Sequence, residues 1–258
     1  MLSRTTLGRL ASGVLFIVLV LGWELLARGS RLSALVLPAP SVIGEALWIG
    51  LRTGYFWPHL RHTGTELVLG LATGCVAGFL GGIVMAESAF LRRLLFPYVV
   101  VSQVVPKLAL APLFIVWFGF GMTSTVVITA LICFFPLMEN TLTGLHQVDP
   151  RKLELFRMLG ATRVQTLLRL KIPSGLPVIM AGFRVAVVLA LVGAVVGEFI
   201  GGSKGLGALI IASQGMMDTP LMFAVLLLIT TLGLLVYQLA IGLERLLLWP
   251  HLKKPDKE

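Results

Sequence analysis

The sequence of 258 residues is 57% hydrophobic and only 13% charged, and its mean hydropathy is +0.96. So little polar surface cannot coat a water-soluble globule of this size, so we expect the chain to lie in a lipid bilayer. The net charge of +9 does not indicate a nucleic-acid-binding protein, because the basic residues lie between apolar runs and form no basic face on a soluble domain.

Six apolar segments are long enough to cross a membrane, since a transmembrane helix needs about 20 mainly apolar residues. They are residues 10–28, 66–86, 94–118, 124–146, 176–199 and 220–243. Arg4 and Arg9 precede the first segment as in a signal peptide, but its long apolar run without an A-x-A cleavage site favours a retained anchor. We predict an all-α polytopic membrane protein with a single transmembrane domain over residues 1–258.

The distribution of lysine and arginine predicts the orientation of the chain, because cytoplasmic loops carry an excess of both. Six spans place the two termini on the same side of the membrane. That side holds two basic residues at the N-terminus, two in residues 87–93, six in residues 147–175 and four at the C-terminus, against five on the opposite side. Both termini are therefore expected in the cytoplasm.

A stripe of glycines marks the second span. Gly70, Gly74, Gly78 and Gly82 recur at every fourth position and form one smooth helix face that another helix can approach closely. The stripe fits close packing within this chain, or a contact between subunits.

Charged residues within spans are costly and are therefore candidates for function. Lys107 follows Pro106, and Pro112 comes soon after, so we expect the span over residues 94–118 to be kinked beside a cavity. Three roles are open for Lys107. It is a counter-charge for an anionic solute, it pairs with an acidic neighbour such as Glu139, or its ammonium group reaches the membrane interface. Glu139, in the fourth span, is a second candidate for a solute contact, or a capping or pairing residue.

The predicted cytoplasmic loop over residues 147–173 has the signals of two short helices, in which apolar and basic residues are interleaved. A helical hairpin of this kind is suited to docking on a partner. The signals are, in chain order, Asp149 as a cap, Pro150 at a first helical position, Gly160 as a tight break, Thr162 with Gln165 as a capping box, and Pro173 as the stop of the second helix.

The fifth span carries two charges. Arg184 is expected to extend to the headgroups on the cytoplasmic side, and Glu198 fits a gate, a contact with a delivering protein, or a solvated helix end. The glycine-rich residues 201–207 lack the G-x4-G-K-[S/T] spacing that cradles nucleotide phosphates, so we expect a turn before a short helix at residues 206–216. The two cysteines and four histidines show no metal-binding spacing, so no metal site is expected.

The loop resembles the cytoplasmic signature of permeases in binding-protein-dependent ABC importers, E-A-A-x3-G-x9-I-x-L-P. The residues at its positions are Glu154, Gly160, Leu170, Ile172 and Pro173, with Leu155 and Phe156 in place of the two alanines. Four further stretches are similar to the nitrate, sulfonate, taurine and pyrimidine-precursor branch of that family: LPAPSVIGEAL, VPKLALAPLFIVWFGFG, FFP and VGEFIGGSKGLGALI.

This resemblance implies a type I ABC importer permease of the bacterial inner membrane, without a catalytic site or bound cofactor of its own. The loop would dock on a cytoplasmic ATPase dimer that binds ATP and Mg²⁺, and an extracytoplasmic binding protein would deliver the solute. A homodimer of the chain is the simpler assembly, with a heterodimer as the alternative. The expected coupling residues are Glu154, Leu155, Phe156, Gly160, Ala161, Leu170, Ile172 and Pro173, and the pathway candidates are Lys107, Glu139 and Glu198.

Two classes of solute fit the resemblance, namely sulfonate-, taurine- or nitrate-like anions and pyrimidine or vitamin precursors. An ion-gradient-driven secondary carrier is the alternative function, although the second half of the sequence shows no broken helix to match the one in the first half. An intramembrane enzyme would need paired acid or nucleophile motifs in facing spans, and the sequence offers none.

Overall fold

The computed structural model describes residues 4–29 and 35–252, and within these ranges all regular structure is helical. Five helices are long and apolar enough to cross a membrane, or six if one bent pair counts as a single span. The predicted all-α membrane architecture is therefore confirmed. In chain order the elements are α1 (Arg4–Gly29), α2 (Pro40–Arg52), α3 (Trp57–Glu87), α4 (Ala89–Val104), η1 (Lys107–Leu110), α5 (Ala111–Phe118), α6 (Met122–His146), α7 (Pro150–Met158), α8 (Arg163–Thr166), η2 (Leu167–Lys171), α9 (Ile172–Gly201), α10 (Leu206–Gly215) and α11 (Thr219–Leu252).

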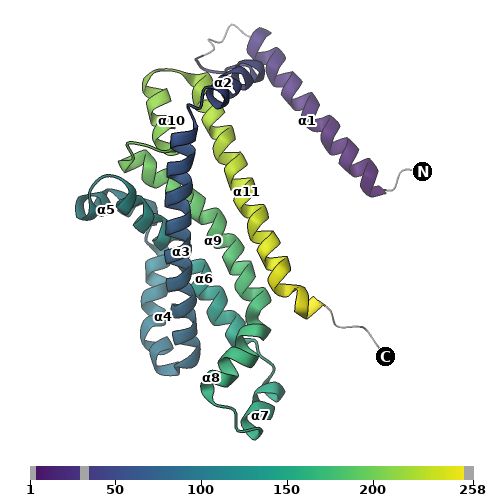
Figure 1. The fold of residues 1–258 in the computed structure, drawn as a ribbon, viewed down its shortest axis with the longest axis vertical. Coiled ribbons are helices and arrows are strands. Elements are labelled where there is room, and N and C mark those ends of the chain that lie inside the picture. Colours follow the sequence, from purple (N-terminus) through teal and green to yellow (C-terminus); the bar gives the residue numbers. More distant parts are fainter. Residues whose placement is uncertain (1–3, 30–34, 253–258) are drawn as a thin grey trace.

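Helices α3, α6 and α9 form the centre of the molecule, with α6 packed against both of the others (Figure 1). The predicted glycine stripe on α3 faces α6. A Cβ atom added to Gly74 would lie 2.5 Å from the carbonyl oxygen of Ala130, and one added to Gly78 would lie 2.5 Å from that of Phe134. Small residues let the helix backbones approach closely, which is the main source of helix association in lipid. The stripe thus serves packing within the chain.

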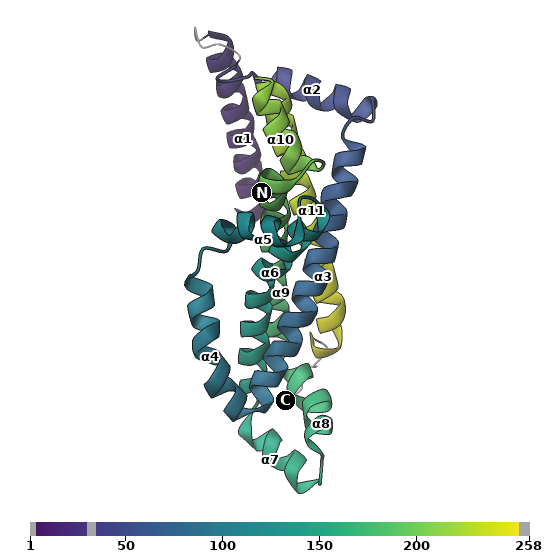
Figure 2. The same cartoon turned by 90° about the vertical axis from the view of Figure 1, so that its left-hand side faces the viewer.

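The predicted span over residues 94–118 is divided into two parts that are bent by 85°. Val105 adopts an extended conformation with ψ of 125° before Pro106, because a residue that precedes proline is disfavoured in the helical region. Figure 2 shows α4 standing off from the bundle and α5 folding back across it. The expected kink at these prolines is a full break.

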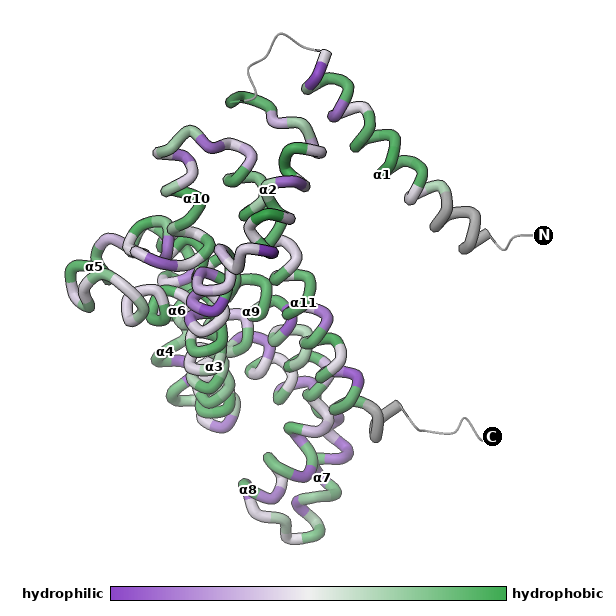
Figure 3. The backbone as a smooth tube through the Cα atoms, turned by 45° about the horizontal axis from the view of Figure 1, so that its top comes forward, coloured by the Kyte–Doolittle hydropathy of each residue, from purple (hydrophilic) through white to green (hydrophobic). Residues whose placement is uncertain are grey.

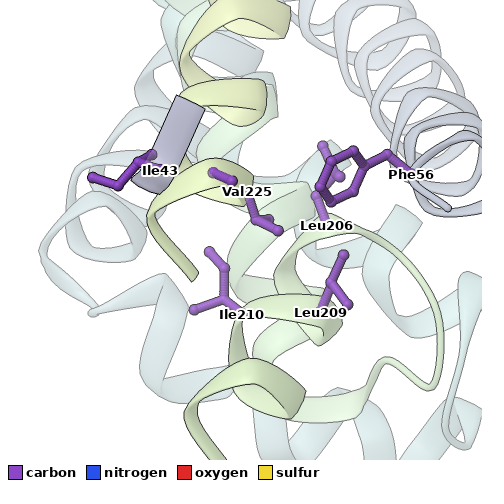
Figure 4. Close-up of a cluster of buried hydrophobic side chains, with 7 residues drawn as sticks. Ile43, Phe56, Leu206, Leu209, Ile210 and Val225 are labelled. Atoms are coloured by element: carbon purple, nitrogen blue, oxygen red, sulfur yellow. The ribbon is translucent and has the colours of Figure 1, made fainter. Parts of the chain in front are cut away.

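One end of the molecule is built around a cluster of buried apolar side chains (Figure 4). The cluster joins α2, the start of α3, α10 and α11. Its members are Ile43, Phe56, Leu206, Leu209, Ile210, Ala224 and Val225. The predicted short helix at residues 206–216 is α10, whereas α2, of 13 residues, was not anticipated although Pro40 at its first position is a helix-start signal.

Helix α1 lies apart from the bundle over most of its length (Figure 1). Figure 3 shows that much of it is hydrophobic. Nine of its large apolar side chains are more than half exposed, namely Val14, Leu15, Phe16, Ile17, Val18, Leu19, Leu21, Leu25 and Leu26. The helix is held at its end, where Glu24 accepts hydrogen bonds from Ser41 of α2 through the backbone N–H at 3.0 Å and the hydroxyl at 2.8 Å. Such a surface suits contact with lipid.

Candidate functional site

The segment over residues 147–173 forms a helical hairpin at the end of the molecule opposite α2 and α10 (Figure 1). Its first helix, α7, begins at Pro150, and the Asp149 carboxylate accepts a hydrogen bond from the backbone N–H of Arg151 at 2.9 Å. Gly160 has a φ of +69°, in the left-handed region that favours glycine. The predicted cap and the predicted break are both confirmed.

The second half of the hairpin starts with the predicted capping box. The Thr162 hydroxyl accepts from the backbone N–H of Gln165 at 3.2 Å, and the Gln165 side chain accepts from the backbone N–H of Thr162 at 2.9 Å. The expectation that this helix ends before Pro173 is wrong, because α8 continues through the π-helix η2 into α9. Pro173 lies in the first turn of α9, where the wider π-helical register accommodates its missing N–H.

The hairpin presents apolar side chains without a partner in the described part of the chain. Leu155 is 53% exposed, Met158 81% and Leu159 72%. Arginines and lysines lie between these side chains along both helices. An exposed surface that mixes apolar and basic residues at the tip of a membrane protein is typical of a docking site for another protein.

The eight expected coupling residues fall into two groups. Glu154, Leu155 and Gly160 are exposed at the tip, whereas Phe156 and Ala161 are half-buried beside them. The remaining three anchor the hairpin to the bundle: Leu170 is buried, and Ile172 and Pro173 are half-buried at the start of α9. The base is also fixed to α3, because the Lys171 Nζ atom lies 2.6 Å from the Glu87 Oε1 atom.

A cavity of about 660 Å³ lies between the α4–η1 break, α6 and α9. Its polar lining consists of Gln103, Lys107, Glu139 and Asn140. The Lys107 ammonium group lies 4.5 Å from the ring centroid of Phe135, which is a cation–π contact. Among the described residues no ion pair joins Lys107 to Glu139, so both side chains face the cavity with capacity for a further partner.

A second cavity of about 690 Å³ shares Glu139 with the first and extends toward the hairpin end of α6. Arg92, Arg93 and His146 line it, and the Arg92 Nη1 atom lies 2.7 Å from the His146 Nε2 atom. The two cavities together form a mainly apolar strip with a few charged and amide side chains along one side of the bundle. We call the residues that line them the pathway surface.

Glu198 does not belong to the pathway surface, although it was a pathway candidate. It is 1% exposed at the end of α9, which excludes the solvated helix end among the three alternatives considered for it. It accepts hydrogen bonds from the Thr63 hydroxyl at 2.6 Å and from the backbone N–H of Gly207 at 2.6 Å. Lys107 and Glu139 thus lie in one place, and Glu198 in another.

Arg184 pairs with an acidic residue that the sequence did not connect to it. Its Nε atom lies 3.1 Å from the Glu244 Oε2 atom, which forms an ion pair between α9 and α11, and the expected extension of Arg184 to the headgroups stays a prediction. Sixty residues separate the two partners, and α9 and α11 meet only in the folded chain.

Glu66 is a buried residue that the sequence analysis missed. It lies in α3 and is 0% exposed, and neither of its carboxylate oxygens has a hydrogen-bond partner. The signal was present, because a carboxylate inside an apolar span is costly and marks a candidate site. Predicted boundaries that began the second span at residue 66 placed it at the membrane edge.

Comparison with known proteins is consistent with this architecture. Residues 77–247 match the family described as "Binding-protein-dependent transport system inner membrane component". The formylaminopyrimidine transport permease protein ThiX of Halalkalibacterium halodurans is 38% identical over 93% of this chain and 94% of its own. The riboflavin transport system permease protein RibX of Chloroflexus aurantiacus is 36% identical over 91% and 87%, respectively.

More distant relatives include the taurine transport system permease protein TauC of Escherichia coli, which is 30% identical over 92% of this chain and 86% of its own. Among solved structures, a chain of the inward-facing MetNI methionine ABC transporter superposes with a TM-score of 0.64 at 19% identity, covering 72% of this chain and 93% of that chain. At this identity the likeness concerns the fold alone, which is that of a type I ABC importer permease.

Proposed function

Because the chain belongs to the family of binding-protein-dependent transport system inner membrane components and is an ABC transporter permease subunit for small solutes, we propose that it works in an ATP-driven importer. A binding protein delivers the solute outside the cell, and a separate ATPase dimer supplies the energy. The hairpin over residues 147–173 is the single observation that carries this proposal, since its ordered tip keeps apolar and basic side chains exposed in the described part of the chain.

The hairpin is the proposed coupling element. Its tip residues Leu155 and Met158 dock in a groove of the ATPase, and its base is rigid because η2 runs directly into α9. Movement of the ATPase on binding ATP and Mg²⁺ is therefore transmitted along α9 to the bundle centre, where α9 packs on α6. In this proposal the chain lies in a bacterial inner membrane, with the hairpin and both termini on the cytoplasmic side, as the lysine and arginine distribution predicts.

The pathway surface is one wall of the proposed solute route. It is open on the side away from α6 and α9, and Val104 beside it is 81% exposed. A closed route needs a second wall, and a second copy of this chain related by two-fold symmetry supplies it most simply. The surface runs from Lys107 through Glu139 to Arg92, and in an importer the solute would move along it toward the hairpin end.

The charges of the first cavity, around Lys107, favour a neutral heterocyclic solute, such as a pyrimidine or vitamin precursor, over a small anion. Lys107 is balanced within the same cavity by the Glu139 carboxylate, which would repel an anion. Gln103 and Asn140 offer amide groups of the kind that hydrogen-bond ring nitrogens and carbonyls, and Phe135 offers an aromatic face. The formylaminopyrimidine and riboflavin permeases also share more identity with this chain than the taurine permease does.

Uptake into vesicles that contain this chain, its ATPase and its binding protein tests the proposal. We expect accumulation of a labelled pyrimidine precursor that requires ATP and the binding protein, and little accumulation of taurine. Accumulation of taurine instead would reject the solute class but keep the importer. Accumulation that follows an ion gradient and ignores ATP would reject the importer and support a secondary carrier.

A further inference from the structure

Three buried side-chain atoms at the junction of α3, α9 and α10 converge without a hydrogen-bond partner. They are His62 Nδ1 and both carboxylate oxygens of Glu66, and they make up half of the six such atoms in the described chain. Ligand atoms of His62, Glu66 and Glu198 all lie within 4.8 Å of one another. Buried polar atoms are nearly always satisfied in proteins, so three together indicate a bound species.

Two hydrogen-bond donors point at the Glu198 carboxylate. Its carboxylate accepts from the Thr63 hydroxyl and from the backbone N–H of Gly207, and the latter is in the first turn of α10. The N-terminus of a helix stabilises negative charge through its free N–H groups and its dipole. The second carboxylate, Glu66, is 0% exposed beside it and has no donor of its own.

A proton alone does not complete this site. Shared between the two carboxylates, it would satisfy one oxygen of Glu66 and leave the other facing the His62 Nδ1 atom at 3.5 Å, the long limit of a hydrogen bond. A divalent cation contacts all three atoms and also cancels the charge of two carboxylates. His59 is not part of this converging group, and its Nδ1 atom lies 3.0 Å from the carbonyl oxygen of Gly205 and 3.2 Å from its nitrogen.

We propose that His62, Glu66 and Glu198 bind a divalent transition-metal cation of the Zn²⁺ or Mn²⁺ type. One imidazole and two carboxylates are a ligand set that suits such ions. The His62 Nδ1 and Glu66 Oε1 atoms lie 3.5 Å apart, close to the separation of about 3.3–3.5 Å that two ligands have when each is about 2.0–2.2 Å from a tetrahedral ion. Ca²⁺ fits less well, since it takes about six to eight oxygen ligands.

The site lies next to the surface and has a structural role. The His62 side chain is 22% exposed, whereas Glu66 and Glu198 are buried behind it. A bound ion joins α3 to the end of α9, next to the apolar cluster in which Phe56 and Leu206 pack (Figure 4). It thereby stiffens the end of the molecule opposite the hairpin, independently of whether the chain takes part in import.

Metal analysis of the purified chain tests the proposal. The chain is isolated in detergent without a histidine tag, stripped with a chelator, and titrated with Zn²⁺ while bound metal is measured by mass spectrometry. We expect about one ion per chain and a higher unfolding temperature with Zn²⁺, since binding to the folded state stabilises it. Glu66→Gln and His62→Ala should each weaken Zn²⁺ binding by at least about 100-fold, more than loss of an outer hydrogen-bond partner causes.

Two substitutions away from the site serve as controls. His146→Ala and Glu24→Gln remove the same side-chain types elsewhere and should leave Zn²⁺ binding unchanged. Glu66→Gln preserves side-chain volume and removes a buried charge, so the metal-free variant should stay folded while its Zn²⁺-dependent thermal shift disappears. A wild-type chain that takes up neither Zn²⁺ nor Mn²⁺, or a Glu66→Gln chain that binds them equally well, overturns the metal site and assigns the cluster to protons and water.

Discussion

Thr63 connects three elements through one hydroxyl group. The hydroxyl donates a hydrogen bond to the Glu198 carboxylate of α9 at 2.6 Å and accepts one from the backbone N–H of Leu206 in α10 at 2.8 Å. Thr63 itself is 0% exposed. Thr63→Val removes the hydroxyl with little change in shape and leaves both partners unsatisfied. We expect a loss of about 2–4 kcal/mol in the free energy of unfolding, since each unpaired buried group costs about 1–3 kcal/mol.

Thermal unfolding in detergent measures this loss. Thr230→Val is the matched control, because the Thr230 hydroxyl is exposed and bonds only to the Leu226 carbonyl of its own helix. The control should change stability by less than about 0.5 kcal/mol, as is usual for surface substitutions. Equal shifts for the two variants would mean that the Thr63 hydrogen bonds do not hold the α3–α9–α10 junction.

Lys107 is the residue for which the proposed solute route makes the clearest prediction. Lys107→Ala removes the ammonium group that faces the cavity and lies over Phe135. We expect ATP-dependent uptake to fall by about 10- to 100-fold, because a hydrogen bond from a charged donor contributes about 1.5–3 kcal/mol. Lys204→Ala, at the exposed turn before α10, should leave uptake unchanged. Normal uptake by Lys107→Ala would place the route elsewhere.

The sequence indicated which single residues are candidates for function better than it indicated which residues they contact. Prolines around Lys107 indicated a cavity, and the cavity contains Lys107 and Glu139. The partner of Arg184 was not predictable, because Glu244 is distant in the chain and only the packing of α11 on α9 brings it near. Glu66 was missed because its role depends on Glu198, which is 132 positions away in the chain, as well as on nearby His62.

The contact between α3 and α6 depends on glycine at particular positions. Gly74→Ala places a methyl group 2.5 Å from the Ala130 carbonyl oxygen, which is backbone and cannot rotate away. We expect a destabilisation of about 1–3 kcal/mol, the usual cost of overpacking. Gly64→Ala, on the same helix with open space around its added atom, should be neutral or stabilising by up to about 1 kcal/mol.

Thermal unfolding of the two glycine variants side by side provides the measurement. Both changes add the same methyl group to the same helix, so intrinsic helix preference cancels in the comparison. If Gly74→Ala is as stable as Gly64→Ala, α3 and α6 are not in the close contact that the structure describes.

The hairpin depends on one glycine in a left-handed conformation. Gly160→Ala has open space for its methyl group, so its effect comes from the φ of +69° alone and amounts to about 1–2 kcal/mol against the turn. A strain of this size lowers the ratio of the dockable turn to other hairpin conformations by about 5- to 30-fold. We expect solute-stimulated ATPase activity of the reconstituted complex to fall by up to about the same factor.

Gly54→Ala is the control for the hairpin variant. Gly54 also has a positive φ, of +79°, but lies between α2 and α3 at the other end of the molecule. Its substitution should impose similar local strain and leave ATPase stimulation near the wild-type level. Equal losses from the two variants would point to general destabilisation, and no loss from Gly160→Ala would remove the hairpin from coupling.

Elements were predictable where composition or a local motif determines them. Apolar runs indicated the long helices, and the capping residues Asp149 and Thr162 indicated the hairpin. The elements that were missed depend on tertiary packing. Helix α2 is held by the apolar cluster that contains Ile43 and Phe56. The helix continues through Pro173 because the π-helical turn η2 before it accommodates a residue without a backbone N–H.

The two proposed sites of the molecule lie at opposite ends of its long axis. One end holds the apolar cluster and the proposed cation site of α3, α9 and α10, and the other holds the hairpin (Figure 1). The pathway surface runs between them on the side of α6. Since α9 extends from the base of the hairpin to Glu198, one rigid element can report a change at either end to the other.

The central claim is that the hairpin docks on an ATPase, and photo-crosslinking in native membranes tests it most directly. A photoreactive amino acid replaces Met158, which is 81% exposed at the hairpin tip, and in a second variant it replaces Trp48, which is 66% exposed in α2 at the opposite end. We predict an adduct with an ABC ATPase subunit from position 158 and none from position 48. No ATPase adduct at position 158, or an equal one at position 48, would contradict the proposed mode of coupling.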